Sequence, residues 1–195
     1  MRTVAAFDFD GTLTRRDTVV PFLMTVCGPV KIAAAAAAIS PWLVGAALDE
    51  RRREDAKERL LRRTVAGRSD TEMREAGRQF ADDIVARRLR DDARARITWH
   101  RGQDHELVLV SASLTHYLDA VAEQLGFDAV LATELEVGPD GRLTGGLVGA
   151  NVRGPEKVRR LEEWLGDDQP AFVWAYGDSA GDRDLLARAD RSQKV

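Results

Sequence analysis

Continuous apolar runs and segments with helical periodicity follow one another along the chain. One apolar run begins at Val4 and ends in a cluster of polar residues, and two others span Glu106–Ser111 and Ala171–Tyr176. Runs of this kind are typical of parallel strands that are buried on both faces. A shorter run, Asp128–Thr133, predicts a further strand. Strands separated by helices predict an α/β fold with a parallel sheet.

From Asp49 to Arg101 the chain is charged and has the spacing of helices. Ser69 and Glu72 match a capping box, which marks the start of a helix. Apolar residues then recur at helical spacing, at Met73, Ala76, Phe80 and Ile84. We expect this stripe to face the core rather than a cofactor.

The stretch Pro21–Leu48 is apolar except for Lys31. A membrane-spanning helix needs about 20 uninterrupted apolar residues. Gly28-Pro29 and Ser40-Pro41 divide the stretch into shorter pieces, so we expect short, buried helices. An interfacial hairpin that meets a lipid substrate is the alternative.

The run Glu106–Ser111 is followed by a predicted helix that ends at Gly126. Ser113 is a candidate N-cap of that helix. Ser111 would then lie between the end of a strand and the start of a helix, where free amides and the helix dipole favour an anion such as phosphate. A capping serine without a ligand is the alternative for this segment.

The C-terminal half predicts a hairpin and then another helix. Glu134–Val148 carries Pro139-Asp140-Gly141 between alternating apolar residues, which predicts two antiparallel strands. Gly154-Pro155 opens a helix, because proline suits the first turn. Lys157 lies in that turn, where the helix dipole disfavours a cation, so an anionic partner explains it better than simple exposure to solvent.

Two aspartates, Asp178 and Asp182, follow the last long run. A turn and a helix from Asp182 to Ala189 would bring both carboxylates to the same side. Only Arg191–Val195 then remain, so we expect no more than a short final strand.

The polar cluster after the first run contains Asp8, Asp10, Gly11 and Thr12. Residues i and i+2 of a strand share a face, and parallel sheets bind ligands beyond the carboxyl ends of their strands. Asp8 and Asp10 are therefore expected to face one small volume, with an ordinary turn as the alternative. A calcium loop is excluded, because the twelfth residue counted from Asp8 is Val19 instead of glutamate.

Four acids are predicted to meet at this edge of the sheet: Asp8, Asp10, Asp178 and Asp182. Two like charges about 4 Å apart repel by roughly 4 kcal/mol at an effective dielectric constant of 20. A divalent cation removes this repulsion, and an all-oxygen site with room for water and phosphate suits Mg²⁺. Lys157 supplies further positive charge.

Composition narrows the classes of partner. The 195 residues carry a net charge of −3, so no overall basic field argues for nucleic acid. Cys27 is the only cysteine, which excludes an intrachain disulfide. Asp8 and Asp10 interrupt the first apolar run too early for a signal peptide. We therefore expect a cytoplasmic protein whose oligomeric state the sequence does not specify.

Four segments together resemble the motifs of the haloacid dehalogenase superfamily, in its phosphoserine-phosphatase-like branch (subfamily IB). In chain order they are Asp8-Phe9-Asp10-Gly11-Thr12, Val110-Ser111-Ala112-Ser113, Gly154-Pro155-Glu156-Lys157 and Gly177-Asp178-Ser179-Ala180-Gly181-Asp182. The resemblance implies a Rossmann-like core, with helices on both faces of its sheet, at residues 1–14 and 101–195. It also implies an inserted all-α cap at 15–100.

The resemblance further implies a Mg²⁺-dependent phosphatase that works through an aspartyl phosphate. Asp8 would be the nucleophile, and Asp10 would protonate the leaving oxygen and later take a proton from water. The transferring group would be held by Thr12, Ser111, Ala112 and Lys157. Asp178, the Asp8 carboxylate and the Asp10 carbonyl would hold the metal, and Asp182 would orient this arrangement.

Some positions depart from the phosphoserine phosphatases that the chain resembles. Asp17 stands where those enzymes place a glutamate that meets the substrate amino group, and Gly181 stands where they usually have asparagine. The second motif has Ser111-Ala112-Ser113 instead of Ser-Gly-Gly. These changes leave the transfer chemistry intact but weaken the case for phosphoserine.

We therefore expect hydrolysis of a small phosphorylated metabolite. The arginine-rich segments of the cap are expected to lie on solvated faces, and the alternative is that one of Arg51, Arg52, Arg53 or Arg59 meets an acidic substrate. A lipid phosphate phosphatase of the phosphatidylglycerophosphate type and a catalytically silent binding module are the alternatives.

Overall fold

A computed structural model of the chain describes residues 2–40, 50–166 and 172–195. Its core is a five-stranded parallel sheet with the strand order β3-β2-β1-β6-β7. These strands are β1 (Thr3–Phe7), β2 (Glu106–Leu114), β3 (Ala129–Thr133), β6 (Phe172–Gly177) and β7 (Arg191–Lys194). The predicted α/β fold is confirmed, and the final strand β7 is short, as expected.

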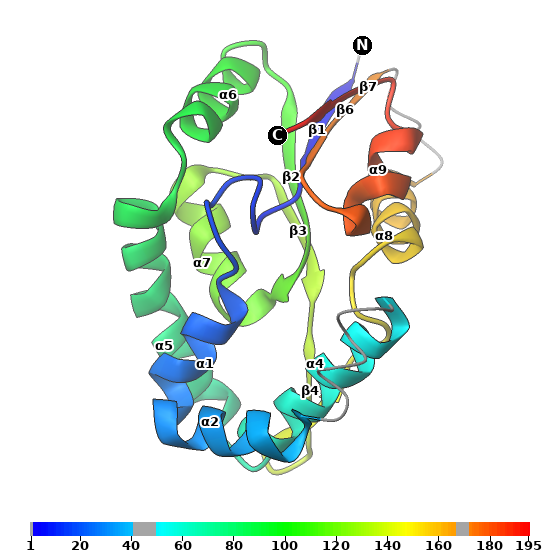
Figure 1. Cartoon of the computed structure of the whole chain (residues 1–195). Coiled ribbons are helices and arrows are strands. Elements are labelled where there is room, and N and C mark those ends of the chain that lie inside the picture. Colours follow the sequence, from blue (N-terminus) through cyan, green and yellow to red (C-terminus); the bar gives the residue numbers. More distant parts are fainter. Residues whose placement is uncertain (1, 41–49, 167–171) are drawn as a thin grey trace.

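Helices cover both faces of this sheet and extend beyond one end of it (Figure 1). They are α1 (Val19–Cys27), α2 (Pro29–Ala38), α4 (Glu50–Thr64), α5 (Asp70–Asp83), α6 (Asp91–Arg101), α7 (Thr115–Leu125), α8 (Pro155–Leu165) and α9 (Arg183–Arg188), together with a π-helical turn, η1 (Ile84–Arg88), and a 3₁₀ turn, η2 (Ala180–Asp182).

Side chains of β1 alternate between two hydrophobic clusters, because successive residues of a strand point to opposite faces. Ala5 and Phe7 belong to the cluster that contains residues of α6 and α7. Val4 and Ala6 belong to the cluster that contains residues of α8 and α9. Burial on both faces explains why the strand sequence is continuously apolar.

The cap helices α1, α2, α4 and α5 lie beyond the carboxyl ends of the sheet strands (Figure 1). The predicted start of α5 is confirmed, since the Ser69 side chain accepts a hydrogen bond from the Glu72 backbone. Along the predicted stripe, Met73, Phe80 and Ile84 are buried in the core. Ala76 is partly buried and packs against the same cluster.

The described part of the apolar stretch forms two short helices, as predicted. Helix α2 is mostly exposed rather than buried, however, with only Ile32 and Ala35 buried among its residues. Within the described residues, no single helix has the length and composition of a membrane span; α1 and α2 pass that test only as a pair, and they are bent by 118°. The bend lies at Gly28, whose φ of 82° is easy only for glycine. The predicted break at Ser40-Pro41 and the remainder of the stretch reach into 41–49, which lie outside the described residues.

Two connections join the cap helices to the core. Thr14 and Leu89 form an isolated antiparallel bridge, and the Arg90 backbone N–H donates to the Leu13 carbonyl (2.9 Å). These contacts place the two connections between cap and core side by side. Helix α6, which the sequence assigned to the cap, instead packs on the sheet beside β2. The return to the core therefore falls at about residue 90 rather than 101.

The predicted hairpin consists of β4 (Leu135–Val137) and β5 (Leu143–Leu147), which pair antiparallel. It contacts the cap, because Leu143 exchanges backbone hydrogen bonds with Gly67 and Arg68, each at 2.8 Å. The hairpin thus joins the cap to the core segment that follows it.

Candidate active site

The first motif forms a tight turn at the carboxyl end of β1. Asp8 follows the strand directly, and its backbone N–H donates to the Tyr176 carbonyl on β6 (2.9 Å). The chain then turns, with the Leu13 N–H donating to the Phe9 carbonyl (2.8 Å). Thr12 closes the turn by donating its hydroxyl to Asp8 Oδ2 (3.1 Å). Asp8 is consequently buried at the centre of the sheet edge.

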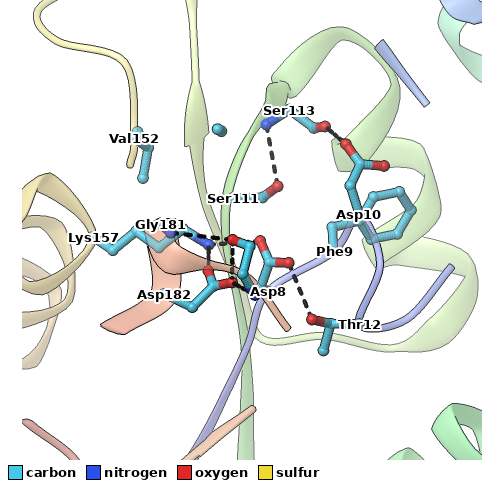
Figure 2. A network of polar contacts seen from close by, with 12 residues as sticks. Asp8, Phe9, Asp10, Thr12, Ser111, Ser113, Val152, Lys157, Gly181 and Asp182 are labelled. Atoms are coloured by element: carbon cyan, nitrogen blue, oxygen red, sulfur yellow. Dashed lines mark hydrogen bonds and ion pairs between the residues drawn. The ribbon is translucent and has the colours of Figure 1, made fainter. Parts of the chain in front are cut away.

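Lys157 lies at the centre of a buried ionic network (Figure 2). Its Nζ donates to Asp8 Oδ1 and to Asp182 Oδ1, each at 2.6 Å. Although burial lowers the pKa of Lys157, the two carboxylates raise it above its usual value, so the residue stays charged. These carboxylates are the anionic partner expected from the position of Lys157 in the first turn of α8.

Asp8, Asp178 and Asp182 each offer one carboxylate oxygen to a cluster whose atoms lie within 4.8 Å of one another. Asp182 is fully engaged, since Oδ1 accepts from Lys157 and Oδ2 accepts from the Ser179 N–H (2.9 Å) and hydroxyl (2.7 Å). Asp178 differs, because its Oδ1 is buried without a hydrogen-bond partner among the described residues. This oxygen and the Asp8 carboxylate are the donors that a hard divalent cation prefers.

The charges of the cluster also favour a bound divalent cation. Burial raises the pKa of Asp8, while the Lys157 charge acts in the opposite direction. Burial and then the charge of Asp182 raise the pKa of Asp178. Three carboxylates against one ammonium leave two negative charges, and two charges no more than 4.8 Å apart repel by at least about 3 kcal/mol at a dielectric constant of 20. The residues present therefore fit Mg²⁺.

The carboxylate of Asp10 turns away from this cluster (Figure 2). Its Oδ1 accepts from the Thr18 N–H (2.9 Å) and hydroxyl (2.7 Å), and its Oδ2 accepts from the Ser113 hydroxyl. Burial, followed by the nearby charge of Asp17, raises the pKa of Asp10 to about 7. The sequence placed the Asp10 carboxylate with the other three acids; the structure separates it from them.

Ser111 does not lie at the start of a helix. Strand β2 continues to Leu114, and α7 begins at Thr115 with Leu114 as an N-cap that makes no side-chain bond. The prediction of Ser113 as N-cap is therefore wrong. Ser111 Oγ instead accepts from the Ser113 N–H (3.1 Å), across an irregularity in the pairing of β2 with β3.

A pocket of about 320 Å³ adjoins Asp10 on the cap side. Its polar lining residues are Asp10, Asp17, Glu54, Lys57, Ser113, Asn151 and Arg153. Lys57 reaches from α4 to the core, where it donates to the Ala112 carbonyl and to Asn151 Oδ1 (2.5 Å). Burial lowers the pKa of Lys57 to about 8. Ala112, predicted as a substrate contact, therefore contacts the cap through its carbonyl.

Sequence reasoning missed five of these polar pocket residues as parts of the site: Glu54, Lys57, Ser113, Asn151 and Arg153. One feature of the sequence pointed to Lys57: the chain has only four lysines against 25 arginines, so each lysine is more informative. Among the predicted cap arginines, Arg59 is exposed, and the side chains of 51–53 lie outside the described residues. Asp17 does line the pocket, as predicted for a substrate contact, with its Oδ1 accepting from the Val20 N–H (3.2 Å).

Comparisons with known proteins agree with this geometry. A family model described as haloacid dehalogenase-like hydrolase matches residues 5–187. Protein CicA of Caulobacter vibrioides is 36% identical over 187 residues, which cover 96% of this chain and 83% of that protein. A phosphoserine phosphatase of Archaeoglobus fulgidus is 36% identical over 87 residues, 44% of this chain and 25% of that enzyme.

Solved structures share the fold over nearly the whole chain. A protein of unknown function from Bordetella pertussis Tohama I superposes with a TM-score of 0.83 at 26% identity, covering 98% of this chain and 89% of its own. A phosphoserine phosphatase solved as a phospho-aspartyl intermediate analogue superposes with a TM-score of 0.69 at 19% identity. The superposition covers 98% of this chain and 85% of that enzyme chain.

Proposed function

Because the chain belongs to the haloacid dehalogenase-like hydrolase family, we propose that it is a Mg²⁺-dependent phosphatase of small phosphate monoesters that forms an aspartyl phosphate. The family and the phosphoserine phosphatases among its relatives assign it to the phosphatases as an enzyme class. The metal, the covalent intermediate and the substrate class are our proposal.

One observation carries the proposal: Asp8, Asp178 and Asp182 form a cluster around a single buried lysine. Asp8 and Asp178, with the Asp10 backbone carbonyl, would hold Mg²⁺, and Asp182 would orient Lys157. The bound ion would neutralise phosphoryl oxygens as the negative charge shifts during transfer.

Asp8 is suited to be the nucleophile, because two contacts fix its carboxylate. Lys157 holds Oδ1 and Thr12 holds Oδ2, so the rotamer is set before substrate arrives. An Asp8 oxygen would form the new bond to phosphorus while the bond from phosphorus to the ester oxygen breaks. Dividing the reaction into two displacements lowers a barrier that is very high in water.

Asp10 is suited to supply the proton that the departing alkoxide needs. Its pKa of about 7 keeps part of the population protonated at neutral pH. It also lines the pocket on the cap side, where the alcohol portion of the ester would lie. After the alcohol leaves, the Asp10 carboxylate would take a proton from the water that attacks the aspartyl phosphate.

The pocket supports a small polar leaving group. Its volume of about 320 Å³ is at the lower end of pockets that bind small molecules. Lys57 and Asp17 give it charges of both signs. The cap contributes Lys57 and would close over the bound ester, which excludes water from the reaction.

A screen of phosphorylated metabolites, with release of inorganic phosphate as readout, tests the proposal. We expect release that needs Mg²⁺ and stops with chelator. The absence of Mg²⁺-dependent release from every ester, including p-nitrophenyl phosphate, would contradict it and would instead support a silent binding module.

A lipid phosphate is the second candidate substrate, favoured by exposed apolar side chains on α1 and α2. Val20, Met24 and Val30 are 38%, 44% and 81% exposed, respectively. Co-sedimentation with anionic vesicles would support this candidate, and a protein that stays in the supernatant would exclude it.

A further inference from the structure

The two oxygens of the Asp10 carboxyl group are held by different kinds of donor, and Figure 2 shows the contact of one of them with Ser113. Oδ1 accepts from the Thr18 backbone N–H at 2.9 Å and from the Thr18 hydroxyl at 2.7 Å. A backbone N–H can only donate, so Oδ1 must remain an acceptor. The proton of the neutral acid therefore resides on Oδ2.

Oδ2 has one contact, with the hydroxyl of Ser113. A serine hydroxyl both donates and accepts, and it rotates freely between these roles. Ser113 can accept from Oδ2–H while Asp10 is neutral, and it can donate to Oδ2 once the proton has gone to the leaving oxygen. The Tyr117 hydroxyl contacts the Thr18 hydroxyl (2.8 Å) and also interacts with the Ser113 side chain, so the two hydroxyls that hold the Asp10 carboxyl group share this phenol as a further partner.

The backbone places the Ser113 hydroxyl firmly. Ser113 is 1% exposed, and it lines the pocket beside Asp10. Its N–H donates to Ser111 Oγ (3.1 Å), and the carbonyl of the same peptide, on Ala112, accepts from Lys57 of the cap. The peptide before Ser113 is thus fixed at both its carbonyl and its amide.

Together these contacts lead us to propose that Ser113 is a positioning residue for proton transfer by Asp10: its hydroxyl holds Oδ2, the oxygen that carries the proton of the neutral acid, and stabilises the carboxylate left after the proton departs. The inference rests on the proposed function, because it presupposes a reaction in which Asp10 is the acid. It assigns a role to a hydroxyl in the second motif that the motif chemistry itself does not require.

The test compares two substrates that differ in their need for an acid. The p-nitrophenolate of p-nitrophenyl phosphate leaves without protonation, whereas the alkoxide of an alkyl phosphate such as glycerol phosphate needs the proton. The measured quantity is kcat/KM, which covers the step in which the leaving group departs. Asp10→Asn is the reference variant: because it lacks the acid, its kcat/KM should fall more for the alkyl ester than for the aryl ester.

We expect Ser113→Ala to lower kcat/KM for the alkyl ester about tenfold more than for the aryl ester, as the loss of one hydrogen bond to a charged group implies. Ser113→Thr, which keeps the hydroxyl, should restore the ratio of the two rates. Thr64→Ala removes a buried hydroxyl that bonds the Leu60 carbonyl in the cap (2.7 Å), and it should leave the ratio unchanged.

Equal losses on both esters in Ser113→Ala would overturn the inference, because a structural role alone would explain them. The proposed function fails differently: wild-type protein would release no phosphate, or Asp10→Asn would lose both esters alike. A selective loss in Asp10→Asn without one in Ser113→Ala leaves the phosphatase intact and refutes the role of Ser113.

Discussion

Gly11 lies so close to Asp178 that a Cβ atom on residue 11 would come within 2.2 Å of Asp178 Oδ2. The φ angle of Gly11 is 84°, a conformation that is easy only for glycine. The turn after β1 can therefore pass directly beside the carboxylate that follows β6. This close approach brings the first and fourth motifs to one cation site.

Gly11→Ala should displace the Asp178 carboxylate from the cluster. A methyl group at this position cannot fit without movement of the turn or of Asp178. We expect the Mg²⁺ concentration for half-maximal activity to rise at least tenfold, as measured by metal titration of phosphate release. Gly141→Ala, with φ of 73° and no heavy atom within 4 Å of a new Cβ atom, is the control for backbone strain alone. Equal metal requirements in the two variants would contradict the expectation.

Asp8→Asn should abolish turnover and keep the fold. The amide nitrogen cannot attack phosphorus, whereas the size and shape of the side chain are unchanged. We expect phosphate release to fall by several orders of magnitude, with an unaltered circular dichroism spectrum. Asp140→Asn, in the hairpin turn, is the matched control and should keep full activity. A near wild-type rate in Asp8→Asn would remove the nucleophile from the proposal.

The strands and the acid cluster could be predicted because their signals are local. Buried strands gave continuous apolar runs, and each motif acid lies just beyond one of them. The prediction for Asp10 failed because the rule that i and i+2 share a face holds only in extended chain. Strand β1 ends at Phe7, and the turn closed by Leu13 and Phe9 rotates Asp10 toward Thr18.

Contacts between cap and core could not be predicted for a different reason. Lys57 is 55 positions from Ala112 and 94 from Asn151, so no spacing rule connects them. They meet because α4 lies beyond the carboxyl ends of the sheet strands and packs on the hairpin strand β5, and that placement depends on the whole fold. The same holds for the Ser113–Asp10 contact, which joins residues 103 positions apart.

Lys57→Met should weaken substrate binding in a pH-dependent way. The pKa of about 8 means that the ammonium is charged below this pH and loses its charge above it. For an ester with an anionic leaving group, we expect the wild-type KM to rise as pH increases through 8, and the KM of the variant to be higher and flat. Lys31→Met is the control, because Lys31 also reaches from a cap helix to a carbonyl, that of Thr64 (2.7 Å), outside the pocket. A pH-independent wild-type KM would contradict this role.

His100 should make the stability of the protein depend on pH below neutrality. The side chain is fully buried, with Nε2 2.8 Å from Tyr176 Oη and Nδ1 2.7 Å from His105 Nδ1. Burial, followed by the charges of His105 and Arg96, lowers the pKa of His100 to about 4. A second proton on this ring would lie among aromatic side chains and against a second imidazole, so the fold excludes it.

The sign of the effect follows from linkage between protonation and folding. In the unfolded chain His100 titrates near 6.5, so between about 6.5 and 4 the unfolded state binds a proton that the folded state does not. Its contribution to stability is therefore complete above pH 6.5 and is lost as the pH falls toward 4. Between pH 7.5 and 5 this amounts to about 2 kcal/mol of the free energy of unfolding.

Urea denaturation at both pH values tests this prediction with the variant His100→Phe, which keeps a ring between Phe7 and Trp174. The variant should lose less stability on acidification than the wild type. Equal losses would show that His100 titrates alike in the folded and unfolded chains.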